Sequence, residues 1–194
     1  MPAIKAVTVF GGAASGLDPV CRETALALGR GLARAGITVI FGGGSIGMMG
    51  AVADGALGEG GEVIGIIPDF LARREIAHTS VSEMIVTDSM HSRKRRMFEL
   101  SDAFVTLPGG LGTLDETFEM ITWRQLDLHS KPIIICDAGG WAGPFLALIE
   151  ALIAQGFAPD HARGLYEVLG SAEAVVARLS ELPAIEEATA VSRL

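Results

Sequence analysis

The stretch Phe104–Glu116, FVTLPGGLGTLDE, decides the fold class of this chain. Its first four residues form an apolar run typical of a buried strand, and Pro108 ends that run. The glycines that follow allow backbone conformations closed to other residues. From Thr113 on, the pattern fits a helix. An apolar strand that passes through a glycine-rich loop into a helix predicts one unit of an α/β sheet.

The same alternation extends in both directions along the chain. Apolar runs predict six strands, at Ala6–Phe10, Thr38–Phe41, Val63–Ile67, Met84–Thr87, Phe104–Leu107 and Ile133–Cys136. Helical patterns lie between and after them, from Pro19 to Gly36 and at Ser45–Leu57, Ser89–Leu100, Thr113–Leu126, about Gly143–Gln155 and Ala172–Leu182, with an irregular stretch at Pro68–Ser82. Continuously apolar strands separated by helices predict a Rossmann-like, doubly wound parallel sheet with helices on both faces. Ligands of such folds bind at the carboxyl ends of the strands.

Length and composition limit the class of protein. The 194 residues suit a single Rossmann-like domain, 1–194, with a frayed tail after about Pro183. A formal net charge of −8 argues against a nucleic-acid partner. No apolar run approaches a membrane span, and the N-terminus does not resemble a signal peptide, so we expect a cytoplasmic protein. The two cysteines and four histidines show no ligand spacing, which predicts neither a metal nor another cofactor.

Two glycine-rich segments follow the first two predicted strands. Gly11, Gly12, Ser15 and Gly16 are suited to receive a phosphate, although a plain strand-to-helix turn would also explain them. Gly42, Gly44 and Gly47 match the pattern G-x-G-x-x-G, but after the second strand, and Asp69 alone could serve as the ribose-binding acid. We interpret this second segment as close packing or as the floor of a pocket, rather than as a dinucleotide site.

Met90–Met97, MHSRKRRM, places four cationic residues in the first half of a helix. The helix macrodipole is positive there, so cations at this end favour an anionic partner. A solvated basic face is the alternative. Because Arg93 shares a face with Met97 and Leu100, we expect it to point inward. Arg93 and Lys94 are the candidate anion-binding residues, whereas Arg95 and Arg96 fit a solvated face.

The loop Pro108–Thr113 is the strongest candidate for binding a phosphate. Exposed amides of a glycine loop and of the first turn of a helix form a natural site for an anion. Thr113 and Glu116 also match a helix capping box, which would explain both residues without chemistry. The capping box explains neither the three glycines nor the basic helix before them, so the sequence favours a functional loop with Glu116 as a catalytic candidate.

With these two motifs together the sequence closely resembles the LONELY GUY family of cytokinin riboside 5′-monophosphate phosphoribohydrolases. The family pattern is a Met-His-x-Arg-Lys-x-x-Met helix followed by Pro-Gly-Gly-x-Gly-Thr-x-x-Glu. Both are present without a gap, at Met90–Met97 and Pro108–Glu116. The resemblance covers nearly the whole chain, through GGGSIGMMG to ITWRQLDLHSKP. In relatives the position of Asp115 is commonly Glu and that of Leu111 is often Tyr.

The resemblance implies roles for individual residues. Arg93 and Glu116 would be catalytic. Residues implied to bind the substrate are Gly12, Ser15, Gly43, Glu75, Met90, Lys94, Gly109, Gly110, Gly112, Thr113, Asp115 and Thr122. A homodimer with pockets near the subunit interface is also implied.

The resulting hypothesis is hydrolysis of the N-glycosidic bond of adenosine 5′-monophosphate or an N6-modified form, giving free base and ribose 5-phosphate. A carboxylate at position 116 would stabilise an oxocarbenium-like transition state. The main alternative is a non-catalytic nucleotide-binding module. A pyridoxal-phosphate decarboxylase would need a Schiff-base lysine, and the chain has only Lys5, Lys94 and Lys131. The displaced glycine pattern weakens a third alternative, a nucleotide-dependent oxidoreductase.

Overall fold

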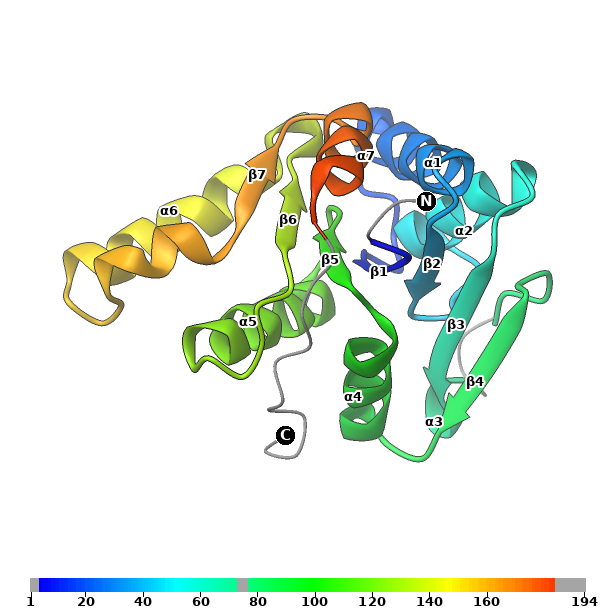
Figure 1. Cartoon of the computed structure of the whole chain (residues 1–194), viewed down its shortest axis with the longest axis horizontal. Coiled ribbons are helices and arrows are strands. Elements are labelled where there is room, and N and C mark those ends of the chain that lie inside the picture. Colours follow the sequence, from blue (N-terminus) through cyan, green and yellow to red (C-terminus); the bar gives the residue numbers. More distant parts are fainter. Residues whose placement is uncertain (1–3, 73–76, 184–194) are drawn as a thin grey trace.

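The computed structural model describes residues 4–72 and 77–183. Strands and helices alternate along this part of the chain (Figure 1). The strands are β1 (Ala6–Phe10), β2 (Thr38–Phe41), β3 (Val63–Pro68), β4 (Glu83–Thr87), β5 (Ala103–Thr106), β6 (Ile133–Cys136) and β7 (Glu167–Leu169). The helices are α1 (Pro19–Arg34), α2 (Gly47–Gly58), α3 (Asp69–Ala72), α4 (Met90–Leu100), α5 (Leu111–Gln125), α6 (Ala142–Ala154) and α7 (Ala172–Glu181), with 3₁₀ turns η1 (Ala138–Gly140) and η2 (Asp160–Leu165).

All seven strands belong to one parallel sheet in the order β4-β3-β2-β1-β5-β6-β7. The chain winds outward from β1 in one direction through β2, β3 and β4, and in the other through β5, β6 and β7. The predicted Rossmann-like, doubly wound architecture is therefore confirmed. The order reverses between β1 and β5, and this reversal is where such sheets bind their ligands.

Both faces of the sheet are covered, which explains why its strands are apolar at nearly every position. Successive side chains of a strand point to opposite faces, so Val105 of β5 packs with α1, α2 and α7, while Phe104 packs with α4, α5 and α6. Figure 1 shows the two helical layers on either side of the sheet. A sheet with one face in water would instead have strands in which polar and apolar residues alternate.

The structure corrects several predicted elements. A seventh strand, Glu167–Leu169, was missed because it is short and lies at the edge of the sheet with partly exposed side chains. The irregular stretch after β3 contains the short helix α3. Helix α5 begins at Leu111 rather than Thr113, because Gly110 is the residue that caps it. The remaining predicted helices differ by one or two residues at their ends.

Candidate active site

A cavity of about 740 Å³ lies at the carboxyl edge of the sheet. Its wall follows the strand order: Leu71 comes from the segment after β3, Met48 and Met49 from the start of α2 after β2, Gly11–Asp18 from the loop after β1, and Pro108–Gly110 from the loop after β5. Ala138, Gly139 and Trp141 extend the wall beyond β6. The cavity thus spans the point between β1 and β5 where the strand order reverses.

The backbone carbonyls of the loop before α5 are held by hydrogen bonds. The Pro108 carbonyl accepts a hydrogen bond from the Gly12 amide at 3.1 Å, and the Gly109 carbonyl accepts one from the Trp141 indole at 3.1 Å. The Gly110 carbonyl accepts the first amide bond of the helix, from Leu114 at 3.0 Å. Every carbonyl of Pro108–Gly110 is therefore engaged. The first-turn amides of α5 have no partner within the helix, and Gly110 supplies no side-chain cap.

Gly109 has to be a glycine for a steric reason. A Cβ atom at this position would lie 2.1 Å from Thr113 Oγ1 and 2.8 Å from the Gly12 amide nitrogen. The loops after β1 and β5 consequently approach each other backbone to backbone. This close approach brings the two glycine-rich segments, each of which we predicted to bind a phosphate, to the wall of one cavity.

Thr113 is buried in the first turn of α5 and does not cap it. The Thr117 hydroxyl donates to the Thr113 carbonyl at 2.7 Å, and it lies 2.9 Å from the Thr106 hydroxyl at the end of β5. This chain of bonds ties the first turn of α5 to the sheet. The capping-box alternative is wrong, because Gly110 occupies the cap and Glu116 lies on the second turn, on the wall of the cavity.

Arg93 projects from α4 into the cavity and is 7% exposed, as its spacing with Met97 predicted. Its Nε donates to the Ile66 carbonyl at 3.1 Å, and an Nη donates to the Gly42 carbonyl at 3.3 Å. A Cβ atom on residue 42 would lie 2.2 Å from this guanidinium. The second glycine segment is closely packed, which is one of the two roles we predicted for it, and Gly42 makes room for the arginine. Gly42, Gly44 and Gly47 do not themselves line the cavity.

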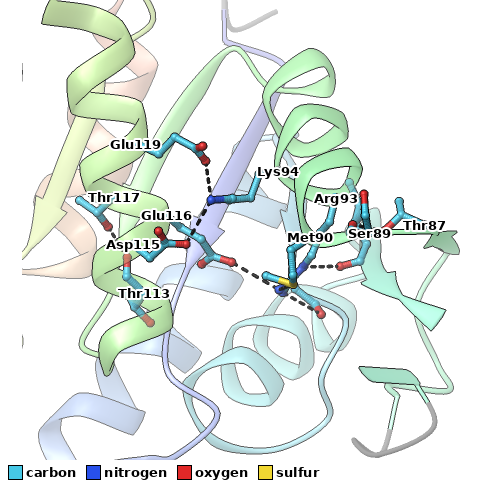
Figure 2. Close-up of polar contacts among 12 residues, drawn as sticks. Thr87, Ser89, Met90, Arg93, Lys94, Thr113, Asp115, Glu116, Thr117 and Glu119 are labelled. Atoms are coloured by element: carbon cyan, nitrogen blue, oxygen red, sulfur yellow. Dashed lines mark hydrogen bonds and ion pairs between the residues drawn. The ribbon is translucent and has the colours of Figure 1, made fainter. Parts of the chain in front are cut away.

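Glu116 faces Arg93 across the cavity (Figure 2). Its carboxylate lies 3.5 Å from an Arg93 Nη nitrogen, and the residue is 8% exposed. Burial raises the pKa of Glu116, although the positive charges of Arg93 and Lys94 act in the opposite direction. A buried carboxyl of raised pKa beside one arginine is typical of a site that does chemistry.

Lys94 bridges α4 and α5 and does not itself line the cavity. Its Nζ lies 3.1 Å from Asp115 and 2.9 Å from Glu119, and Figure 2 shows it between the two carboxylates. Burial lowers the pKa of Lys94, but the hydrogen bonds to Glu119 and Asp115 outweigh it and raise that pKa. Arg95 and Arg96 pair with Glu99 at the surface, as the solvated-face interpretation predicts.

The structure brings together most of the residues implied by the family resemblance. Those that line the cavity are Gly12, Ser15, Met90, Arg93, Gly109, Gly110, Gly112, Thr113 and Glu116. Lys94, Asp115, Gly43 and Thr122 lie outside its wall, so a contact between them and a substrate stays a prediction. Glu75 lies outside the described residues.

Sequence reasoning missed several residues of the cavity wall. Trp141 follows β6, a strand whose carboxyl end meets the same edge as those of β1 and β5. A search of every strand end would have found it. Met48, Met49 and Leu71 form an apolar part of the wall, and their sequence pattern is indistinguishable from that of core residues.

The contents of the cavity wall restrict the chemistry. Lys5, Lys94 and Lys131 are the only lysines of the chain, and none lines the cavity, so a Schiff-base mechanism has no nucleophile there. Within residues 4–72 and 77–183, no group of three or more His, Cys, Asp or Glu side chains is placed to hold a metal ion. Over the same ranges, none of the helices has the length and apolarity needed to cross a membrane.

A doubly wound sheet with glycine loops at its switch point and a buried Arg–Glu pair defines a nucleotide-binding protein of the Rossmann-like class. Residues 49–179 match a family model described as possible lysine decarboxylase. The chain is 40% identical over 179 residues to the cytokinin riboside 5′-monophosphate phosphoribohydrolase of Rhodococcoides fascians, covering 92% of this chain and 90% of the relative. The chain belongs to this family, known as LONELY GUY.

Further relatives agree with this assignment. The cytokinin riboside 5′-monophosphate phosphoribohydrolase LOG of Oryza sativa subsp. japonica is 39% identical over 175 residues, covering 90% of this chain and 72% of the relative. Among solved structures, a molybdenum cofactor binding protein from Rippkaea orientalis superposes with a TM-score of 0.69 at 22% identity, over 90% of this chain and 94% of that chain. At that identity the superposition supports the fold alone.

Proposed function

We propose that this protein hydrolyses the N-glycosidic bond of a nucleoside 5′-monophosphate of the adenine type, giving the free base and ribose 5-phosphate. The observation that carries the proposal is the buried Arg93–Glu116 pair on the wall of the cavity that the glycine loops border. The names of the curated relatives support the same reaction.

In this proposal each part of the cavity wall has its own role. The amides at the start of α5 receive the 5′-phosphate, because they are donors whose neighbouring carbonyls are all engaged. The ribose then lies beside Glu116, whose carboxylate stabilises positive charge that develops at C1′. Water forms the new bond to C1′ as the bond to the base breaks, and one water proton is transferred to the leaving base.

Arg93 keeps this arrangement stable. Its guanidinium donates hydrogen bonds to the backbone carbonyls of Ile66 and Gly42 and also faces Glu116. Its position therefore depends on the sheet and not on the carboxylate alone. A fixed positive charge allows a phosphate and a carboxylate to share one cavity. The base then occupies the apolar part of the wall near Met49, Leu71 and Met90, on the β2–β4 side of the cavity.

The alternative, a nucleotide-binding module without catalysis, is tested by Glu116→Gln. We expect this variant to bind AMP about as tightly as the wild type while its rate of base release falls about 10²–10⁴-fold, as is usual when a positioned acid–base group is removed. Chromatography of the free base and calorimetric titration of AMP measure the two quantities. Wild-type protein that binds AMP and releases no base from AMP or from isopentenyladenosine monophosphate would establish the binding module instead.

We further propose that the protein is a cytoplasmic homodimer. The family resemblance supports the dimer, and so do large apolar side chains left exposed on the described part of the chain, among them Leu17, Ile46 and Leu111. Light scattering coupled to size-exclusion chromatography tests the dimer, because a mass equal to one chain over a range of concentrations would contradict it.

A further inference from the structure

We propose that Trp141 is a positioning residue that orients the phosphate-binding loop through the hydrogen bond from its indole to the Gly109 carbonyl. This inference rests on the proposed function only in taking the bound anion to be the 5′-phosphate. Trp141 lines the cavity, yet it lies outside both motifs that relate this chain to its family.

The first argument concerns the carbonyls of the loop. Pro108 and Gly110 have their carbonyls held by backbone amides, those of Gly12 and Leu114. The Gly109 carbonyl accepts a hydrogen bond from Trp141 Nε1 at 3.1 Å. It is therefore the single carbonyl of Pro108–Gly110 whose hydrogen bond comes from a side chain.

The second argument follows from peptide geometry. In a trans peptide the carbonyl and the next amide point in opposite directions. By holding the Gly109 carbonyl, Trp141 also sets the direction of the Gly110 amide, at the cap of α5. Glycine has little conformational preference of its own, so this peptide would otherwise rotate at small energetic cost and could turn a carbonyl toward an anion.

The third argument is that the backbone that carries the indole is fixed in place. Gly139 and Gly140 both adopt positive φ, at 63° and 75°, which turns the chain sharply after β6. The Asp137 carboxylate then accepts the Ala142 amide at 2.8 Å and fixes the start of α6 directly after Trp141. A Cβ atom on residue 139 would lie 3.2 Å from the Asp18 carboxylate at the start of α1, so this turn is closely packed.

The test is Trp141→Phe, which keeps an aromatic ring in the cavity wall and removes the N–H donor. Loss of one net hydrogen bond corresponds to a weakening of about 2- to 12-fold, so we expect the affinity for ribose 5-phosphate to fall within that range. Binding of adenosine, which has no phosphate, should stay unchanged. In turnover of AMP, KM should rise by a similar factor while kcat changes less than KM.

Trp123→Phe is the matched control, because it makes the same chemical change in a tryptophan that packs on Phe98 and does not line the cavity. It should leave ribose 5-phosphate affinity unchanged. It also leaves Trp141 as the single tryptophan, so ribose 5-phosphate should change its fluorescence. This second measurement keeps residue 141 intact, so it does not depend on the folding of Trp141→Phe.

The outcomes separate this inference from the proposed function. Trp141→Phe protein that binds ribose 5-phosphate as tightly as the wild type would overturn the role of the indole, even if the enzyme is active. Equal weakening toward adenosine and ribose 5-phosphate would also overturn it, since that indicates a general disturbance. Wild-type protein that releases no base, combined with selective weakening in the variant, would remove the proposed function and leave this inference standing.

Discussion

Arg93 and Glu116 face each other, but the protein satisfies their charges unequally. The guanidinium donates hydrogen bonds to two backbone carbonyls, at 3.1 and 3.3 Å, whereas the carboxylate has, among the described residues, Arg93 as its nearest cation, at 3.5 Å. Separating a buried carboxylate from water is costly unless it is well paired. The raised pKa of Glu116 expresses this cost. Its carboxylate is thus available to interact with a cation that forms on a substrate.

Lys94 provides the first prediction at this scale, because its charge lowers the pKa of Glu116 from outside the cavity. In Lys94→Met that influence is lost, so the pKa of Glu116 rises further. If the ionised carboxylate is the active form, the acidic limb of the kcat profile moves to higher pH. We expect a larger loss of kcat at pH 5 than at pH 8, measured by release of base from AMP.

Arg95→Met is the control for this prediction. It removes one positive charge from the neighbouring position of α4, where the arginine pairs with Glu99 at the surface. Its pH profile should match that of the wild type. A raised KM for Lys94→Met with an unmoved pH profile would contradict our expectation, and would instead support direct contact between Lys94 and the nucleotide.

The residues of the site differ in how far the sequence could predict them. Helical spacing was enough to place Arg93 inward, because Met97 and Leu100 mark the buried face of α4. Glu119 was missed, although it follows Glu116 by three residues and therefore shares its side of α5. Trp141 could not be linked to Gly109 by any local rule, since that contact depends on how β5 and β6 are paired.

At the scale of elements, the crossing of α1 and α2 is closed by interlocked glycines. A Cβ atom on Gly29 of α1 would lie 2.1 Å from the Val52 carbonyl of α2. On Gly55 of α2, a Cβ atom would lie 2.2 Å from the Leu26 carbonyl of α1. At each glycine, the missing side chain leaves room for the backbone of the other helix. Helix α1 follows the cavity loop after β1, and the start of α2 contributes Met48 and Met49 to the cavity wall. The distance between the two helices therefore also affects the position of this part of the wall.

We therefore predict that Gly29→Ala destabilises the protein, by about 1–3 kcal/mol or more, because a carbonyl cannot move aside as a flexible side chain can. Gly58→Ala is the matched control, since it lies at the end of α2 with open space around its Cβ position. That variant should be neutral or more stable by up to about 1 kcal/mol. Urea unfolding measures both, and equal midpoints would contradict the prediction.

Elements were predictable where they are long and buried. The six longer strands were predicted because apolar runs on a two-sided sheet are conspicuous, and α1 because Asp18 and Pro19 mark its start. β7 has three residues and pairs along a single edge, so it owes its existence to β6 rather than to its own pattern. The start of α5 was misplaced because glycine capped the helix where a threonine suggested a cap.

For the whole molecule, the pH dependence of stability involves the buried His129, because the hydrogen bonds of its two ring nitrogens require a neutral imidazole. His129 Nε2 lies 2.9 Å from the Met120 carbonyl, an acceptor, while Nδ1 accepts the Lys131 amide at 3.1 Å. A proton on Nδ1 would face that amide and break the bond. The ring also packs against Phe98 and Phe104, joining the segment after α5 to the core of this face. Burial lowers the pKa of His129 to about 4.

The pH dependence of global stability follows from this pKa. The unfolded chain has an ordinary histidine pKa near 6.5, so the unfolded state takes up the proton first as the pH falls. His129 therefore stabilises the fold above pH 6.5, and this contribution is lost as the pH falls from 6.5 toward 4. A difference of that size corresponds to roughly 3 kcal/mol of the free energy of unfolding.

His129→Gln isolates this contribution, because glutamine keeps a donor for the Met120 carbonyl and does not titrate. Other groups titrate over the same range in both proteins, so their effects cancel in the comparison. Between pH 7 and pH 4 the wild type should lose roughly 3 kcal/mol more stability than the variant in denaturant unfolding. NMR titration should place the wild-type imidazole pKa near 4. Parallel stability curves for the two proteins would show that His129 accepts a proton in the fold as readily as in the unfolded chain.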